Sequence, residues 1–203
     1  MTVGITDAQL AALGVLGHFA GPAAYLAGGV GVALRMGHRL SRDLDLFTPE
    51  VDVERLAEEV VTGQSGAKIL SRAAGTLYLD IAGVPASILR YSYPLLGEPE
   101  RITGIPVRVA SLPDLSCMKL SAVAGRGARR DFWDLSVLLE RLGWSLPFAL
   151  EQYQRKYTSE DVGHVVRSLV YFTDAEAEPW PTELSRQEWQ RIKEDFIARV
   201  RAL

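Results

Sequence analysis

Two aspartates, Asp43 and Asp45, are the residues of this sequence whose type and spacing best suit chemistry. They lie in an alternating polar and apolar stretch, residues 43–47, that predicts a strand, so both carboxylates leave the same face. Two adjacent carboxylates repel each other. A hard divalent cation such as Mg²⁺ relieves that repulsion and bridges the carboxylates to substrate phosphates. The alternative is an exposed strand edge that forms ion pairs with Arg39 or Arg42.

A glycine pair, Gly28 and Gly29, precedes these aspartates. Residues 23–27 predict a short strand that ends at the pair, and residues 30–36 predict a short helix after it. Glycine lets the backbone take positive φ and approach a ligand closely. The free N–H groups at the start of a helix suit a phosphate. A diglycine alone is usually just a turn, but glycine pair, helix and carboxylate pair in this order predict a metal–triphosphate site.

A second group of charged residues lies further along the chain and comprises Lys119, Asp131 and Asp134. The two aspartates are three residues apart and share one face of a predicted helix. The lysine ammonium is a compact charge that suits a phosphate. Two interpretations stay open. Either Lys119 faces a triphosphate while Asp131 or Asp134 acts as a base or orients it, or the lysine forms an internal ion pair with these carboxylates.

The predicted elements that would position these residues fall into a mixed α/β half and a helical half. The boundary is expected near Ser111, which gives domains of residues 1–110 and 111–203. In the first half, helices are predicted over residues 7–19, 30–36 and 51–61, and strands over residues 23–27, 43–47, 67–72, 76–81, 86–91 and 105–110. In the second half, a helix opens at Ser111 and Pro113, and helices follow near residues 130–142, 146–156, 161–172 and 186–203.

Composition excludes several classes of protein. The net charge of −3 argues against a broad basic surface for non-specific nucleic-acid binding, and residues 125–130 form the densest cationic stretch. No apolar run is long enough to span a membrane, and no signal peptide is expected at the N-terminus. One cysteine, Cys117, excludes an internal disulfide and fits a reducing cytoplasm. It is expected inside a helix as a small apolar residue.

The pattern of these segments resembles the signature of nucleotidyltransferases, an apolar residue and a glycine pair followed by an apolar-flanked Asp-x-Asp. More narrowly, it is similar to the AbiEii toxin family of bacterial toxin–antitoxin systems. The likeness runs in consistent order over residues 20–142. The segments that carry it are residues 26–29, 37–39, Ser41, 43–47, 118–122 and 129–135.

The resemblance implies an α+β fold, in which a nucleotidyltransferase-like mixed sheet with flanking helices is followed by a C-terminal helical region. It implies a toxin that uses Mg²⁺ to transfer a nucleotide from a nucleoside triphosphate to a hydroxyl of RNA, with tRNA expected, or of a protein. A cognate antitoxin would be a partner. Asp43 and Asp45 would hold the metal. The nucleotide-binding residues implied are Gly28, Gly29, Arg39, Ser41 and Lys119.

The signature also resembles that of the polymerase-beta-like nucleotidyltransferase superfamily. Its enzymes normally add a third metal-binding carboxylate from a later strand, and the place of this carboxylate is open in this sequence. Asp80, in the predicted strand 76–81, is one candidate. The next strand resembles the one that often bears the acid but offers Ser87. If Ser87 takes that place, the protein would bind nucleotides without turnover, or would rely on Asp131 or Asp134. A further alternative is a protein that docks a partner with its helical half.

Overall fold

The computed structural model describes residues 4–63 and 66–203, and the chain divides into two compact units. The first unit contains Met1–Tyr93 and Glu98–Ser111, and the second contains Pro94–Gly97 and Leu112–Leu203. Each unit has its own cluster of buried apolar side chains. The fold is α+β, as predicted. Among the described residues, no helix is both long enough and apolar enough to cross a membrane.

The first unit is built on one mixed sheet, whose seven strands within the described residues lie in the order β3-β4-β5-β2-β1-β7-β6. Only two neighbouring pairs are parallel, β2 with β5 and β1 with β7. The other pairs are antiparallel. The strands are β1 (Tyr25–Leu26), β2 (Leu44–Thr48), β3 (Ala67–Ala73), β4 (Thr76–Ile81), β5 (Val84–Arg90), β6 (Glu100–Arg101) and β7 (Arg108–Val109).

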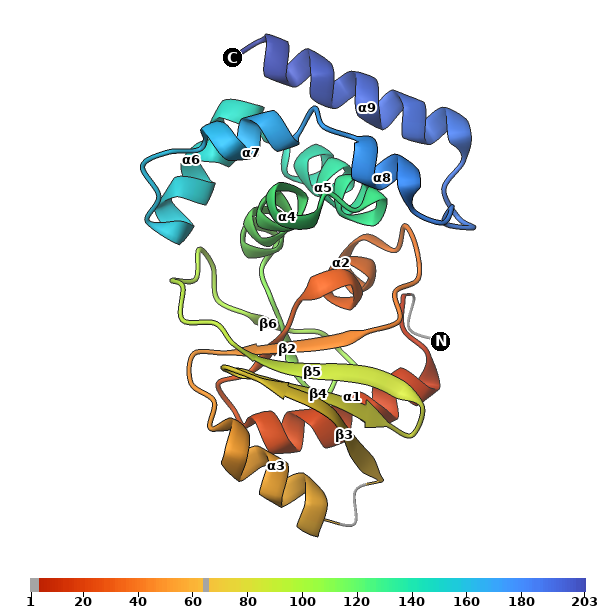
Figure 1. Ribbon diagram of the computed structural model, residues 1–203, viewed down its shortest axis with the longest axis vertical. Coiled ribbons are helices and arrows are strands. Elements are labelled where there is room, and N and C mark those ends of the chain that lie inside the picture. Colours follow the sequence, from red (N-terminus) through yellow and green to blue (C-terminus); the bar gives the residue numbers. More distant parts are fainter. Residues whose placement is uncertain (1–3, 64–65) are drawn as a thin grey trace. The chain divides into compact units, whose positions relative to one another are not determined.

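Helices α1 (Asp7–Ala20) and α3 (Val53–Thr62) lie along one side of this sheet (Figure 1). Their apolar side chains pack with alternate residues of β2, β4 and β5, such as Leu46 and Leu79, in one buried cluster. The strands therefore alternate, with apolar residues toward α1 and α3 and more exposed residues on the other face. Helix α2 (Gly28–Met36) follows β1 directly.

A capping box opens α1, and one of its residues also reaches the carboxylate strand. Gln9 N–H donates to Thr6 Oγ1, and Thr6 N–H donates to Gln9 Oε1. The side chain of Gln9 is buried, and its Nε2 donates to the carbonyl oxygens of Ser41 (2.7 Å) and Arg42 (3.0 Å). Gln9 thus fixes the backbone that leads into β2, a role that its capping-box spacing alone does not predict.

The second unit consists of helices packed around buried aromatic and aliphatic side chains. Its helices are α4 (Leu112–Arg126), α5 (Arg129–Leu142), α6 (Leu146–Tyr157), α7 (Gly163–Ser168), α8 (Thr173–Ala177) and α9 (Arg186–Arg201). Cys117 lies in α4 and is buried, as expected, and burial raises the pKa of its thiol to about 12.

The helix predicted over residues 161–172 is wrong in extent. It ends at Ser168, because the N–H groups of Val170 and Tyr171 donate to the carbonyls of Arg167 and Ser168, three residues back, and form tight turns. The short helix α8 follows and was not predicted, since five residues are too few to show a helical period. The two-residue strand β6 was missed for the same reason.

A loop from the first half of the chain, residues 94–97, belongs to the helical unit because it binds to a buried ion pair. Lys156 Nζ lies 2.6 Å from Asp114 Oδ1, and both side chains are fully buried. The backbone N–H groups of Leu96 and Gly97 donate to the Asp114 carboxylate, and Lys156 donates to the Pro94 carbonyl. Burying these two charges is possible because their hydrogen bonds are satisfied.

Candidate functional site

The turn from β1 into α2 lies directly against the carboxylate strand. The backbone N–H of Ala27 donates to the carbonyl of Asp45 (3.1 Å). Gly28 has a φ of +61°, which side chains disfavour. A methyl group at position 28 would lie 2.5 Å from Oδ2 of Asp45. Position 28 therefore requires glycine both for its backbone and for the space that the Asp45 carboxylate occupies.

The second glycine packs against two further predicted residues. A methyl group at Gly29 would collide with Oγ of Ser41 and lie 3.0 Å from Nη2 of Arg39. Arg39 is buried, and its Nη1 donates to the carbonyl of Leu40 (2.8 Å). The glycine pair thus brings together Arg39, Ser41 and Asp45, which the sequence assigned to one site.

The start of α2 leaves its first N–H groups available to an anion. Its N-cap residue is Ala27, whose side chain cannot accept a hydrogen bond. Gly28 and Gly29 place no side chain of their own over these N–H groups. At its other end α2 is held by Arg35, which donates to the carbonyls of Val109 and Ala110 and pairs with Glu100 at 2.8 Å. The helix is therefore anchored with its positive end beside Asp45.

Asp45 and Ser87 face each other across β2 and β5. They are directly paired in the parallel register, and Ser87 Oγ donates to Oδ1 of Asp45 at 2.6 Å. Ser87 is buried. Ser87 is therefore the direct neighbour of Asp45 on β5. That it stands in the place of a third acid stays a prediction.

The other two predicted metal ligands differ in their placement. Asp43 is exposed and lies one residue before β2, so strand alternation puts it on the side of Asp45. Asp80 lies near the end of β4, where it pairs in register with Pro85. Its carboxylate accepts a hydrogen bond from Gly83 N–H (2.9 Å) and so stabilises the β4–β5 turn. The structure does not join Asp80 to Asp45.

The donor set around Asp45 suits one Mg²⁺ ion. Among the described residues, no group of three or more His, Cys, Asp or Glu side chains could hold a metal. Mg²⁺, however, commonly uses one or two carboxylates together with substrate phosphates and water. Asp43 and Asp45 would supply the carboxylates, and the start of α2 would supply N–H groups for the phosphates.

The cluster predicted in the helical unit is a compact, buried set of ion pairs. Lys119 Nζ lies 2.7 Å from both Asp131 Oδ1 and Asp134 Oδ2, and all three side chains are buried. Arg126 adds two hydrogen bonds to the Asp131 carboxylate, of 2.6 and 2.9 Å. Burial by itself raises the pKa of Asp131, but the hydrogen bonds and charges of Arg126 and Lys119 outweigh it, so the pKa lies below its ordinary value.

The cationic stretch 125–130 is not a free basic patch. Arg126 binds Asp131. Arg129 is buried, and its guanidinium lies 4.3 Å from the ring centre of Trp180 and donates to the carbonyls of Glu178 and Pro179. This arginine therefore anchors the segment between α8 and α9, a role that the sequence did not reveal.

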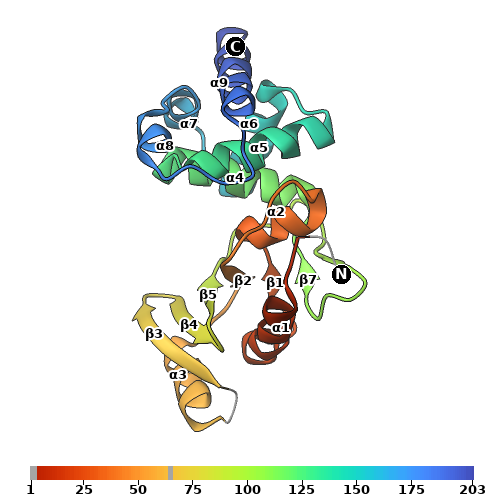
Figure 2. The same ribbon diagram turned by 90° about the vertical axis from the view of Figure 1, so that its right-hand side faces the viewer.

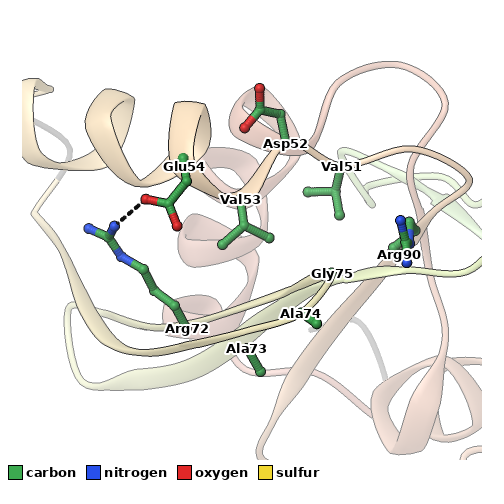
Figure 3. A pocket seen from close by; sticks show the side chains of 9 residues that line it. All are labelled: Val51, Asp52, Val53, Glu54, Arg72, Ala73, Ala74, Gly75 and Arg90. Carbon is green, nitrogen blue, oxygen red and sulfur yellow. Dashed lines mark hydrogen bonds and ion pairs between the residues drawn. The ribbon is translucent and has the colours of Figure 1, made fainter.

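An open pocket of about 630 Å³ lies elsewhere in the first unit, between the start of α3 and the β3–β4 turn (Figure 3). It contains none of the predicted site residues. Arg72 pairs with Glu54 across it at 2.6 Å. Arg90, at its edge, pairs in register with Thr48, whereas Ser87 pairs with Asp45 nearer the start of the same strands. We assign no role to this pocket.

Residues 15–202 match the family described as nucleotidyl transferase AbiEii toxin, type IV TA system. The chain is 34% identical over 195 residues to an uncharacterized protein of Aquifex aeolicus (strain VF5), covering 95% of this chain and 91% of that protein.

Among solved structures, the chain resembles MenT4, the nucleotidyltransferase toxin Rv2826c of Mycobacterium tuberculosis H37Rv. The TM-score is 0.60, and the match covers 100% of this chain and 87% of that chain. At 16% sequence identity, this likeness shows a shared fold.

Proposed function

Because this chain belongs to the AbiEii family of nucleotidyltransferase toxins, we propose that it transfers a nucleotide from a nucleoside triphosphate to a hydroxyl of RNA, with Mg²⁺ bound by Asp43 and Asp45. tRNA is the acceptor that the resemblance suggests. The observation that supports this most directly is the contact between the glycine turn and the Asp45 carboxylate. A triphosphate bound at the start of α2 would lie beside the residues that hold its metal.

In this proposal each residue of the site has a separate task. The N–H groups at the start of α2 bind the phosphates, and Arg39 and Ser41 stand beside Gly29 to contact phosphate oxygens. Asp43 and Asp45 would hold Mg²⁺, which would supply positive charge against the charge that develops on the phosphates. Ser87 orients Asp45 through its hydrogen bond.

The reaction requires one bond to form as another breaks. The acceptor hydroxyl oxygen attacks the α-phosphorus and gives up its proton to water. The bond between that phosphorus and the bridging oxygen breaks, and pyrophosphate leaves with the electron pair. The attacking and leaving oxygens lie in line. The chain's contribution is to hold the triphosphate and the acceptor in that alignment.

Lys119, Asp131 and Asp134 are also predicted to take part, and their catalytic roles remain predictions. In the described structure Lys119 is paired with both carboxylates. These pairs alone account for the burial of all three side chains.

The test is transfer of label from each of the four α-labelled nucleoside triphosphates to total RNA, with and without Mg²⁺. The wild-type protein should label RNA, and Asp45→Asn should reduce the rate by about 10²–10³-fold, the range typical for loss of one electrostatic contact to the transition state. Thermal unfolding should show that the variant is folded. Labelling by Asp45→Asn at the wild-type rate would falsify this assignment.

A second function has one observation in its favour, which is that Ser87 rather than a carboxylate faces Asp45. With two acids the protein would bind Mg²⁺ and a nucleotide without turnover. This alternative predicts a nucleotide-dependent rise in Tm with no label transferred to any acceptor. The family description as a toxin of a type IV toxin–antitoxin system also leads us to propose a cognate antitoxin as a partner.

A further inference from the structure

A row of residues paired across neighbouring strands begins at Asp45 and runs over β5 to β4. Asp45 pairs with Ser87 on β5, and Ser87 pairs with Tyr78 on β4. Residues directly paired in register present their side chains on the same face. Since adjacent strands are about 4.8 Å apart, Tyr78 lies roughly 10 Å from Asp45 across the sheet. The three residues therefore share the face opposite α1 and α3.

Tyr78 is exposed on this face. Its side chain is 42% accessible, whereas its strand neighbours Leu77 and Leu79 are completely buried on the other face. Within residues 4–63 and 66–203, the side chain of Tyr78 forms no hydrogen bond or ring contact, and only its backbone is bonded in the sheet. The ring and its hydroxyl are thus available to a ligand.

Lys68 provides a cation on the same face. It lies on β3, pairs in register with Asp80, and is exposed. Asp80 itself accepts a hydrogen bond from Gly83, and Lys68 forms no ion pair in the described part of the chain. Strands β3, β4 and β5 lie side by side in Figure 2. An exposed aromatic ring and a free ammonium therefore stand on adjacent strands.

The strand order determines from which side an acceptor can approach Asp45. β1, which leads into Gly28 and Gly29, borders β2 on one side, and β5 borders it on the other. A triphosphate at the glycine turn lies on the β1 side of Asp45. Because the attacking and leaving oxygens are in line, an acceptor that attacks opposite a pyrophosphate held at the glycine turn would enter from the side of Ser87 and Tyr78.

We propose that Tyr78 is the stacking platform for the terminal base of a single-stranded RNA acceptor, with Lys68 beside its phosphate. The inference rests on the function proposed above. A chain with a net charge of −3 has little general attraction for phosphate, so RNA affinity must come from local contacts. Stacking on an aromatic ring is such a contact, and it requires an unpaired base.

The experiment measures binding of a short, fluorescein-labelled oligoadenylate by anisotropy, in the presence of Mg²⁺ and a non-hydrolysable nucleoside triphosphate. Tyr78→Ala should raise the Kd about ten-fold or more, and Tyr78→Phe should stay within about two-fold of wild type, because the ring is what stacks. Tyr171→Ala is the matched control, since Tyr171 is 52% exposed in the other unit, and should leave the Kd unchanged.

Further outcomes decide the proposal. No binding of the oligonucleotide by the wild-type protein, or equal binding by Tyr78→Ala, overturns it. A Tyr78→Ala variant that loses only a protein partner also overturns it, since the face would then dock a protein. If Tyr78→Ala and Tyr171→Ala weaken binding of the oligonucleotide equally, the effect is a general one of the surface and counts against the proposal.

The same variants separate this inference from the proposed function. If the wild-type protein binds the oligonucleotide through Tyr78 but labels no RNA, the stacking site stands and the transferase function fails. If the wild-type protein labels RNA and Tyr78→Ala does so with an unchanged KM for RNA, the function stands and the stacking site fails. Both the transferase function and the stacking site are supported if Tyr78→Ala raises the KM for RNA and leaves the Kd for the nucleotide unchanged.

Discussion

The carboxylates in the two units differ in how deeply they are buried. In the helical unit, Asp131 and Asp134 are buried, and Lys119 and Arg126 neutralise them at 2.6 to 2.7 Å. In the α/β unit, Asp43 is exposed and Asp45 is half-buried. The contact between Asp45 and Ser87 joins the carboxylate to a neutral hydroxyl.

This contrast indicates which carboxylates are built for a ligand. A cluster whose charges balance internally is satisfied by the protein alone, and removing one member leaves a buried charge unpaired. A pair of aspartates beside an uncapped helix start leaves room for a cation and for phosphates. We therefore expect the α/β carboxylates to control activity and the helical cluster to control stability.

The largest expected effect comes from removing the lysine of the helical cluster. Lys119→Met should lower the free energy of unfolding by about 3–5 kcal/mol, because two buried carboxylates lose a partner. Urea unfolding measures this, and Asp45→Asn is the matched variant that should change stability far less. If Lys119→Met unfolds like the wild type but loses nucleotide binding, the contrast is wrong and Lys119 faces the triphosphate.

Alanine substitutions at two separate glycines, Gly28 and Gly143, distinguish backbone strain from crowding at the site. Gly28 and Gly143 have nearly equal φ values, +61° and +65°, but a methyl group meets Asp45 at position 28 and nothing within 4 Å at position 143. Each alanine substitution should cost about 1–2 kcal/mol of stability from the left-handed backbone. Only Gly28→Ala should also reduce the transfer rate, by about 10²-fold, since it displaces Asp45.

Gly143→Ala is the control for Gly28→Ala, and both variants are measured in the same two experiments. Unfolding curves report the shared backbone strain, and initial rates of label transfer report the displaced carboxylate. Equal rates in Gly28→Ala and Gly143→Ala would show that the glycine turn does not border a reacting group.

The change in the free energy of unfolding at acidic pH tests the ion pairs of the helical cluster. The pKa of Asp131 lies below its ordinary value of 3.8 in the folded protein. The stabilisation that this carboxylate provides is therefore complete above about pH 4 and is lost as the pH falls through its folded-state pKa. Asp131→Asn should be less stable than wild type at neutral pH, with a smaller further loss on acidification. An unchanged acid profile in urea unfolding would contradict the ion pairing.

The smallest effect is expected at Ser87. Ser87→Ala removes one hydrogen bond to Asp45, worth about 1 kcal/mol, so the transfer rate should fall by about five-fold. Ser87→Thr keeps the hydroxyl and should restore most of the rate. An equal loss in both variants would mean that packing around position 87, rather than the hydrogen bond, sets the rate.

The local part of the site could be predicted from the sequence because its members lie close together in the chain. Gly28, Gly29, Arg39, Ser41 and Asp45 fall within one strand–helix–strand unit, and the spacing of residue types shows its period. The capping box of α1 is local in the same way, since its two residues lie three apart. The contact of Gln9 with Ser41 and Arg42 was not predicted, since 32 and 33 residues separate the partners.

The parts that the sequence left open or missed depend on long-range pairing. The parallel register that sets Ser87 opposite Asp45 joins residues 42 apart, and no local pattern encodes it. Lys156 and Asp114 are also 42 residues apart. The sequence favoured neither interpretation of Lys119, because a lysine that binds a phosphate and one that binds a carboxylate have the same local signature.

The central claim is that the glycine turn and the paired aspartates form one pocket for a metal-bound triphosphate. The most direct test is a crystal structure of the protein with Mg²⁺ and a non-hydrolysable nucleoside triphosphate. We expect phosphate oxygens on the N–H groups of Gly28 and Gly29, and the ion on Asp43 and Asp45. A nucleotide bound away from α2, or a metal held without Asp45, would contradict the account.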